Sequence, residues 1–319
     1  MSTSSWLQTP HRLDLTGRVV LLATDGSAGA VAGAHVAVAL AVKHRAEVHV
    51  VSVVDTRGAP IPSPVDLAVS MCDAAVGPSI HAEQEHQVRA ALSTATGHEI
   101  AWPVRVMLGV PAKAIVEEAR HLDAALIIVG LRQHGRVDRV LNDETTLEVM
   151  RHASCPVLGV VQGTTGLPTR VLAAMDFGET SLIAAGAART ITAANARFVL
   201  AYVEALTAFL PDDGELEIHN LGVKAAFART ARELGRSNGD HIVLDDVVLH
   251  REVPRSPAEV LLDYADDANV DLIAAGSARH GRVDRWMLGS VSAELVRDGR
   301  RSVLIVPPRA ASPASVGHV

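Results

Sequence analysis

The stretch HGRVDR at residues 134–139 occurs a second time at residues 280–285, 146 positions further along the chain. With this offset held without gaps from Pro111 to Val161, 17 of 51 positions are identical. Near the start of each copy, RVVLLATDGS at residues 18–27 matches TRVLAAMDFG at residues 169–178 with an offset of 151. A match of this length within one chain indicates two related domains in tandem.

The repeat also sets the expected domain boundaries. Two domains are predicted over residues 17–162 and 168–308. Between them, QGTTGLP at residues 162–168 has the Gly, Thr and Pro content of a linker. Residues 1–16 and 309–319 are expected to be flexible tails.

Each half alternates short apolar runs with segments of helical spacing. In the first half, residues 19–23 and 48–54 are apolar runs, and Val31, Ala34 and Val38 recur between them at the spacing of a helix face. Such runs are typical of parallel strands that are buried on both faces. The order predicts two doubly wound, Rossmann-like α/β domains, each with a five-stranded parallel sheet flanked by helices. Ligands are expected where the strand order reverses, at the carboxyl ends of the strands.

The composition excludes several classes of protein. The formal net charge is −7 and the pI is near 6.1, which argues against nucleic acid as a partner because phosphate neutralisation requires clustered positive charge. The two cysteines, Cys72 and Cys155, are too few for a disulfide framework. The longest weakly polar run, residues 30–42, is shorter than the roughly 20 residues of a membrane helix. We therefore expect a cytoplasmic protein with no membrane partner.

Motifs for catalysis and metal binding are also missing from the sequence. None of its three lysines follows the glycine run of a P-loop, and it has no Gly-x-Ser-x-Gly elbow. His81 and His86 stand five residues apart, which would place them on different sides of a helix. Cys155 precedes a proline at a predicted strand start and is interpreted as a buried structural thiol, with a redox sensor as the alternative. No catalytic residue and no metal site are expected.

The segment from Gly276 to Ser292, GSARHGRVDRWMLGSVS, carries the functional signal. Its glycines allow the backbone to approach a ligand closely, and Gly289-Ser290-Val291-Ser292 opens a predicted helix. The first amides of a helix have no partner within it and carry partial positive charge, which favours an anion such as phosphate. The alternative is that the glycines only permit tight turns and that a serine caps the helix.

With these features the chain resembles a tandem universal stress protein. The resemblance rests on ATDGS at residues 23–27, on Cys155-Pro156-Val157 and above all on the loop from Gly276 to Ser292. Nucleotide-binding members carry glycine, two residues, glycine, nine residues, glycine, then serine or threonine. Gly276, Gly289 and Ser290 fall on that pattern, whereas Arg279 stands at the middle glycine and Gly281 lies two places later.

The resemblance implies an adenine nucleotide α-hydrolase-like fold and an adenine nucleotide site in the second domain. The cofactor would be ATP with Mg²⁺, and its hydrolysis, if any, slow and incidental. The residues implied as binding are Asp176, Val203, Gly276, Arg279, Gly281, Gly289, Ser290, Val291 and Ser292. For Asp176, a helix cap or Asx turn is the alternative role.

The two halves differ at the implied phosphate loop. Asp143 and Glu144 stand where the second half has Gly289 and Ser290. Carboxylates at a helix start satisfy its amides and repel a polyphosphate. We therefore expect a degenerate loop and weak or no ATP binding in the first domain.

Two functions remain open at this stage. One is a nucleotide-responsive regulator of the stress response, and the other is a ligand-free interaction or scaffold protein in which both sites are degenerate. By resemblance the two domains would form an intrachain pseudo-dimer, and whether the chain also forms a homodimer is left open.

Overall fold

The computed structural model describes most of the chain as two compact units. The described residues are 7–9, 11–57, 76–131, 139–205, 213–235, 243–252, 254–277, 288–298 and 300–308. The N-terminal unit spans Leu15–Gly166, and the C-terminal unit combines Leu167–Val319 with Met1–Asp14. The division after Gly166 lies in the segment between the two expected domains.

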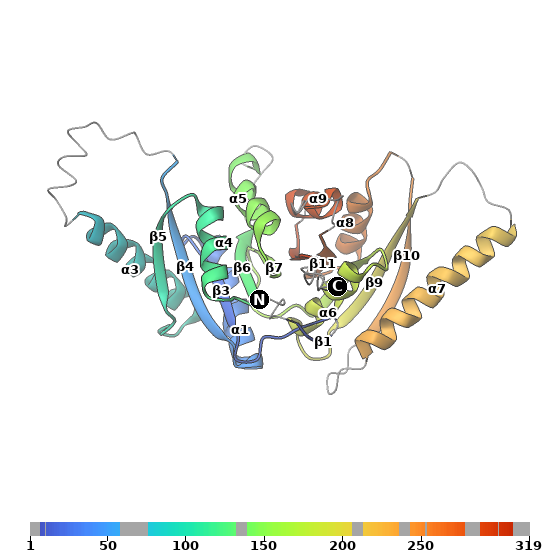
Figure 1. Ribbon diagram of the computed structural model, residues 1–319, viewed down its shortest axis with the longest axis horizontal. Helices are drawn as coiled ribbons and strands as arrows, with labels where there is room; N and C mark the ends of the chain where they lie inside the picture. Colours follow the sequence, from blue (N-terminus) through green and yellow to red (C-terminus); the bar gives the residue numbers. More distant parts are fainter. Residues whose placement is uncertain are drawn as a thin grey trace, which may run out of the picture. The chain divides into compact units, whose positions relative to one another are not determined.

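The N-terminal unit is built on a parallel sheet. In its described part the strands run in the order β7-β6-β3-β4-β5, and each neighbouring pair is parallel (Figure 1). Leu21 on the central strand β3 and Ile127 on its neighbour β6 are completely buried, as expected for strands covered on both faces. The strands are β3 (Val19–Ala23), β4 (Glu47–Asp55), β5 (Val104–Gly109), β6 (Leu126–Leu131) and β7 (Val157–Val161).

Helices cover both faces of this sheet. Right-handed crossovers place the two helices that follow β3 and β4 on one face and the two that follow β5 and β6 on the other. The contacts agree, because α1 packs on α3 and α4 packs on α5. These helices are α1 (Ala28–His44), α3 (Val76–Thr96), α4 (Pro111–His121) and α5 (Arg139–His152).

The C-terminal unit repeats this architecture. Its described strands have the order β10-β9-β8-β11-β12, again parallel throughout. The strand order reverses between β8 and β11, which is where doubly wound sheets bind ligands. The predicted fold class is confirmed in both units. The strands are β8 (Arg170–Met175), β9 (Arg197–Ala205), β10 (Val243–Arg251), β11 (Leu272–Gly276) and β12 (Ser302–Val306).

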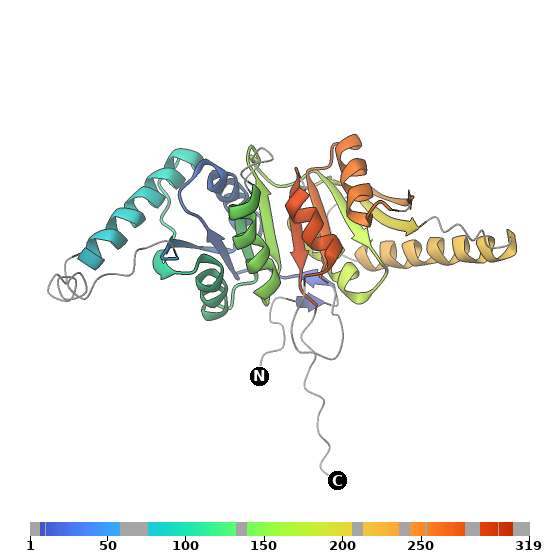
Figure 2. The ribbon, with the colours of Figure 1, turned by 90° about the horizontal axis from the view of Figure 1, so that it is seen from above.

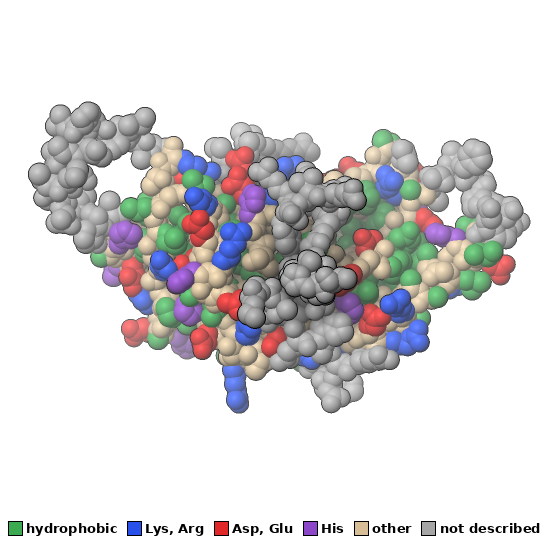
Figure 3. Space-filling view, in the orientation of Figure 1, with side chains coloured by type: hydrophobic (Ala, Val, Ile, Leu, Met, Phe, Trp, Pro, Cys, Tyr) green, Lys and Arg blue, Asp and Glu red, His purple; other side chains and the backbone are tan. Residues whose placement is uncertain are grey.

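Four helices flank the described part of the second sheet, namely α6 (Glu179–Thr190), α7 (Asp213–Gly235), α8 (Pro257–Asp267) and α9 (Ser290–Asp298). The view from above separates α6 and α7 on one side of the sheet from α8 on the other (Figure 2). Helix α7 keeps apolar side chains in solvent, with Leu216, Ile218 and Leu221 43%, 72% and 59% exposed. Figure 3 shows hydrophobic side chains in the region of α7 and the neighbouring strands.

The N-terminal segment packs on the C-terminal unit. Strands β1 (Leu7–Thr9) and β2 (Arg12–Leu13) form an antiparallel pair, and β2 lies on α6. A Cβ atom on Gly186 would lie only 1.6 Å from the carbonyl oxygen of His11, so the close approach requires glycine. The Thr190 hydroxyl donates to the Leu13 carbonyl at 3.1 Å.

This arrangement differs from the flexible tail expected over residues 1–16. Leu13 is 1% exposed, which is the burial of a core residue. This packing was not predictable from sequence because the partner helix α6 lies more than 160 residues away along the chain, and contacts of such separation leave no local pattern.

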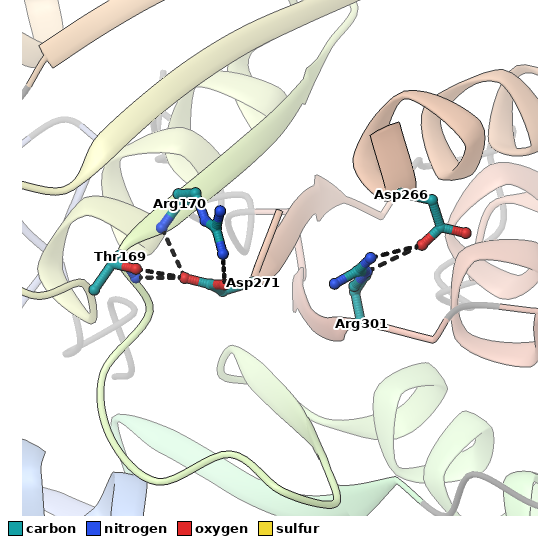
Figure 4. A network of polar contacts seen from close by, with 5 residues as sticks. All are labelled: Thr169, Arg170, Asp266, Asp271 and Arg301. Carbon is teal, nitrogen blue, oxygen red and sulfur yellow. Dashed lines mark hydrogen bonds and ion pairs between the residues drawn. The ribbon is translucent and has the colours of Figure 1, made fainter. Parts of the chain in front are cut away.

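A half-buried carboxylate, that of Asp271, joins the amino ends of β8 and β11. Oδ2 of Asp271 accepts hydrogen bonds from the Thr169 amide and hydroxyl, at 2.9 and 2.7 Å, and from the Arg170 amide at 3.0 Å (Figure 4). Burial by itself would raise the pKa of Asp271, but these hydrogen bonds and the Arg170 charge hold that pKa below its usual value. The cluster lies at the edge of the sheet opposite to the expected ligand site.

Candidate functional site

The candidate site begins at the carboxyl end of β8, where Asp176 follows the strand. Asp176 is exposed, and its Oδ1 accepts a hydrogen bond from the Gly178 amide at 2.8 Å. Asp25 makes the same contact with the Ser27 amide, at 2.9 Å, in the N-terminal unit. The Asx turn weighed as an alternative role for Asp176 is therefore present, and the exposed carboxylate still faces solvent at the strand end.

The residue after this aspartate has a left-handed backbone in both units. It is Gly26 in the N-terminal unit, with φ of 79°, and Phe177 in the C-terminal unit, with φ of 59°. A bulky residue is rare in this conformation. Packing holds the Phe177 ring, which lies 5.2 Å from the Tyr202 ring and 5.0 Å from the Phe227 ring, measured between centroids.

Gly276 ends β11 and is held close to α6. A Cβ atom at this position would lie 2.7 Å from Cγ2 of Thr180 and 2.9 Å from its backbone. Packing against the start of α6 therefore suffices to require a glycine here, independently of any ligand.

Helix α9 starts beside the end of β11. The Gly289 carbonyl accepts from the Ala293 amide at 2.9 Å, which makes Gly289 the N-cap of α9. Ser292 is 2% exposed, and its hydroxyl donates to the Gly276 carbonyl at 3.1 Å. The structure therefore brings Gly276, Gly289 and Ser292 together, and one hydrogen bond fixes the amino end of α9 against the carboxyl end of β11.

Val203 lies on the other side of Asp176, near the end of β9. The register between β8 and β9 ends with Met175 opposite Tyr202, so Val203 is the first β9 residue past the last pair. The next residue, Glu204, contacts His219 with 2.5 Å between Oε1 and Nε2. Sequence reasoning missed this contact because α7 and β9 meet only through the tertiary fold.

The remaining predicted residues are placed as follows. Ser290 is exposed and Val291 half-buried in the first turn of α9. Arg279 and Gly281 lie outside the described residues, as do the repeated histidines His134 and His280.

The first half departs from the expectation at its phosphate loop. Helix α5 begins at Arg139, so Asp143 and Glu144 occupy its fifth and sixth positions. The expectation that these two residues start the helix was wrong. The amides at these positions belong to the helical interior, where each has a carbonyl partner four residues earlier.

Neither a metal cluster nor a membrane span emerges from the described residues. In that part of the chain, no group of three or more His, Cys, Asp or Glu side chains is placed to hold a metal ion. None of the helices described is both long and apolar enough to cross a bilayer. Cys155 is buried, and burial raises the pKa of its thiol to about 12, which fits the structural role.

Two solved structures with the same fold match nearly the whole chain, and a third structure matches less than half of it. A universal stress protein from Archaeoglobus fulgidus DSM 4304 is 18% identical, with 93% of this chain and 99% of that chain covered and a TM-score of 0.56. A putative universal stress protein from Pseudomonas aeruginosa UCBPP-PA14 is 15% identical, with 91% and 93% covered and a TM-score of 0.56. A universal stress protein in complex with cAMP is 22% identical and covers 44% of this chain and 97% of its own, with a TM-score of 0.34.

The family comparison matches the chain twice. The universal stress protein family covers residues 17–160 and again residues 168–307. These matches include most of both sheets and their helices. The chain therefore belongs to the universal stress protein family, with two family domains in tandem.

Proposed function

We propose that the C-terminal unit binds an adenine nucleotide, ATP with Mg²⁺, and that the chain acts as a nucleotide-responsive regulator in the stress response. The observation that carries the proposal is the hydrogen bond from Ser292 to the Gly276 carbonyl. It holds the amino end of α9 at the point where the strand order reverses, next to Asp176.

The start of α9 suits an anion. Glycine at the N-cap has no side chain to occupy the first amides, and the first turn contains no acidic residue. Helix α8 shows the opposite arrangement: the Ser256 hydroxyl accepts from the Glu259 amide and the Glu259 carboxylate accepts from the Ser256 amide. The amides of Ser290 and Val291 are thus the ones suited to phosphate oxygens.

The other parts of a nucleotide have counterparts nearby. The exposed carboxylate of Asp176 suits the ribose hydroxyls, because carboxylate oxygens accept hydrogen bonds. Val203, lying past the last β8–β9 pair, suits the base edge through its backbone. Mg²⁺ would offset the phosphate charge, and no described side chain is assigned to it.

We expect the N-terminal unit to bind nucleotide weakly or not at all. The positions that correspond to Gly289 and Ser290 lie inside α5, where the amides already have partners. This reason differs from the one inferred from sequence, which required the acids to cap the helix, but it predicts the same asymmetry.

The alternative is a ligand-free interaction protein, and specific contacts favour it. Asp176 caps its own turn, Gly276 is required by its contact with Thr180, and the Ser292 hydroxyl is engaged with Gly276. Each predicted residue therefore also has a purely structural task.

Binding to the purified full chain decides between the two. We expect about one nucleotide per chain by equilibrium dialysis with ATP and Mg²⁺, and a stabilisation of about 2.7 kcal/mol at a hundredfold excess over the dissociation constant. Gly289→Asp should lower the affinity at least about tenfold, since the new carboxylate takes the amides. It should not lower the melting temperature, because aspartate is a favourable N-cap.

A matched control adds the same charge elsewhere. Gly222 lies on the exposed face of α7 with nothing within 4 Å of its Cβ position, so Gly222→Asp should leave nucleotide binding unchanged. Undiminished binding in Gly289→Asp would contradict the proposed site, and a wild-type chain that binds no nucleotide would favour the interaction protein.

A further inference from the structure

Strand β10 forms the outer edge of the C-terminal sheet. Among the described strands it pairs only with β9, in nine consecutive residue pairs without a bulge. None of its nine residues is buried. A long, regular edge of this kind can pair with a strand of another molecule, and proteins commonly block it with Pro, Lys or a bulge. The sequence of β10, VLDDVVLHR, contains neither Pro nor Lys.

The charges of β10 exclude most ways of pairing it with a second copy of itself. In an edge strand only every second residue directs its N–H and C=O outward, so an antiparallel self-pair must be centred on a residue. Centring on Asp245 or Asp246 would place that aspartate opposite its own copy, and like charges directly opposite are destabilising. Centring on Leu249 would place Asp246 opposite Glu252. Centring on Val247 would place each charged side chain opposite an apolar one.

Centring on Val248 instead places opposite charges against each other. Asp246 then lies opposite His250 of the second copy, and Asp245 lies opposite Arg251. The twofold axis repeats both pairs, so the junction contains each of them twice. An imidazole donates a hydrogen bond to a carboxylate in its neutral as well as its protonated form. Because opposite-charge pairs across antiparallel strands are stabilising, this is the register that the charges favour.

The contacts of β10 within its own unit leave these pairs available. The Asp245 side chain is 51% exposed, although it lies 3.6 Å from a guanidinium nitrogen of Arg197. Arg251 donates to the Arg255 carbonyl through one of its nitrogens, at 2.9 Å, and a guanidinium has further donors. The side chain of His250 is exposed. Each of these side chains can therefore contact a second copy without losing the contact that it already makes.

The amino-terminal part of α7 presents an apolar surface beside this edge. Figures 1 and 2 show it extending past β10 on the outer side of the C-terminal unit, and residues 216–222 are all exposed. Clustered exposed apolar side chains mark interaction surfaces, and helices in proteins are stabilised mainly by packing of an apolar face. The apolar side chains in this part are Leu216, Ile218 and Leu221.

A twofold junction at β10 brings the two copies of this surface together. His219 of α7 contacts Glu204 on β9. Glu204 is opposite His250 in the β9–β10 register, so α7 lies on the face of the sheet that carries His250 and, by alternation, Val248. The axis of an antiparallel self-pair is perpendicular to the sheet, which puts α7 of the second copy on the same face. The protruding part of each helix then extends over the other copy.

We propose that the chain forms a homodimer through β10. The two β10 strands pair antiparallel with Val248 opposite Val248, and the protruding parts of the two α7 helices pack over the junction. The second copy is the occupant that fits this edge, because its charges complement those of β10 in one register. The proposal does not rest on nucleotide binding.

Sedimentation equilibrium of the full chain measures this association. We expect a reversible equilibrium between monomer and dimer in the wild type. Asp245→Arg and Arg251→Asp each place like charges opposite each other twice per dimer, so each variant alone should associate at least about tenfold more weakly. The control Asp267→Arg makes the same charge change at an exposed position of α8 and should dimerise like the wild type.

Mixing the two variants tests the register. In a mixed dimer, the arginine introduced in one copy lies opposite the aspartate introduced in the other, and the native Asp245 and Arg251 also lie opposite each other. The mixture should therefore associate within about threefold of the wild type, which also shows that both variants are folded. A wild-type chain that stays monomeric, single variants that dimerise like the wild type, or a mixture that stays monomeric would overturn the proposal.

A third variant tests the contribution of α7. Ile218 is 72% exposed, so Ile218→Asp should leave the fold unchanged. It should weaken dimerisation at least about tenfold, because the new carboxylate would be buried between the two helices. Unchanged dimerisation of Ile218→Asp would refute the packing of the α7 helices over the junction.

Discussion

Gly186 offers the sharpest test of the packing between the N-terminal segment and α6. An alanine at this position would place Cβ 1.6 Å from the His11 carbonyl oxygen and 2.7 Å from its carbonyl carbon. An overlap with backbone atoms at 1.6 Å cannot be relieved by a side-chain rotation. We therefore expect Gly186→Ala to detach the segment from α6.

The magnitudes decide which assay can show this. Detachment loses about 2 kcal/mol from the burial of Leu13 and about 1 kcal/mol from the hydrogen bond of Thr190. These losses are offset in part because alanine favours a helix over glycine by about 1 kcal/mol and because the freed residues regain conformational entropy. The global free energy of unfolding should then change little, while the local protection of the segment should collapse.

Hydrogen exchange of the amides of residues 11–14 is therefore the deciding measurement. We expect exchange at least about tenfold faster in Gly186→Ala than in the wild type, with the strands of the C-terminal sheet still protected. The control is Gly222→Ala on α7, where nothing lies within 4 Å of the Cβ position. It should stabilise the protein by about 0.5–1 kcal/mol in urea denaturation and leave the segment protected. The reasoning would be refuted if Gly186→Ala stabilised the protein as much as Gly222→Ala does and left hydrogen exchange at residues 11–14 unchanged.

Three further outcomes are expected from the contacts described. Asp271→Asn should lower the free energy of unfolding by about 1 kcal/mol at pH 7. Because the pKa of Asp271 is lowered in the folded state, its contribution to stability is present above the unfolded pKa and is lost as the pH falls through the folded pKa. Acid denaturation of the variant should therefore depend less on pH than that of the wild type. In a Cys72→Ser background, iodoacetamide should alkylate Cys155 at pH 8 only after denaturant is added, since its thiol pKa is raised to about 12; rapid labelling of the native chain, read by mass spectrometry, would contradict the buried role. Ser292→Ala should lower the free energy of unfolding by about 1 kcal/mol, because the hydrogen bond to the Gly276 carbonyl is lost. It should also weaken ATP binding more than Ser290→Ala does, since the Ser290 side chain is exposed. Equal effects of the two variants on ATP binding would show that the position of α9 does not depend on this hydrogen bond.

The sequence by itself determined the tandem architecture. The repeated HGRVDR and the aligned strand starts at residues 18–27 and 169–178 reveal the duplication. Continuous apolar runs such as residues 19–23 identify strands buried on both faces. These signals are local, because a parallel strand covered by helices must be apolar at each position regardless of which helix covers it.

The sequence also located most of the candidate site. Asp176, Gly276 and Gly289 were identified from loop position and spacing, and all three lie at the carboxyl edge of the second sheet. Their contacts were not predictable. The engagement of Ser292 with Gly276 depends on where α9 lies relative to β11, which local spacing does not specify.

Only the tertiary structure decided the features that join distant segments. In the aligned repeat α9 starts at Ser290, five places later than α5 does at Arg139, although both halves contain the same HGRVDR stretch, because a helix end depends on which partners its amides find. The packing of the N-terminal segment on Gly186 and that of the Phe177 ring on Phe227 likewise arise from non-local contacts. Hydrophobic periodicity predicts that a residue is buried, whereas the tertiary fold determines which atoms it contacts.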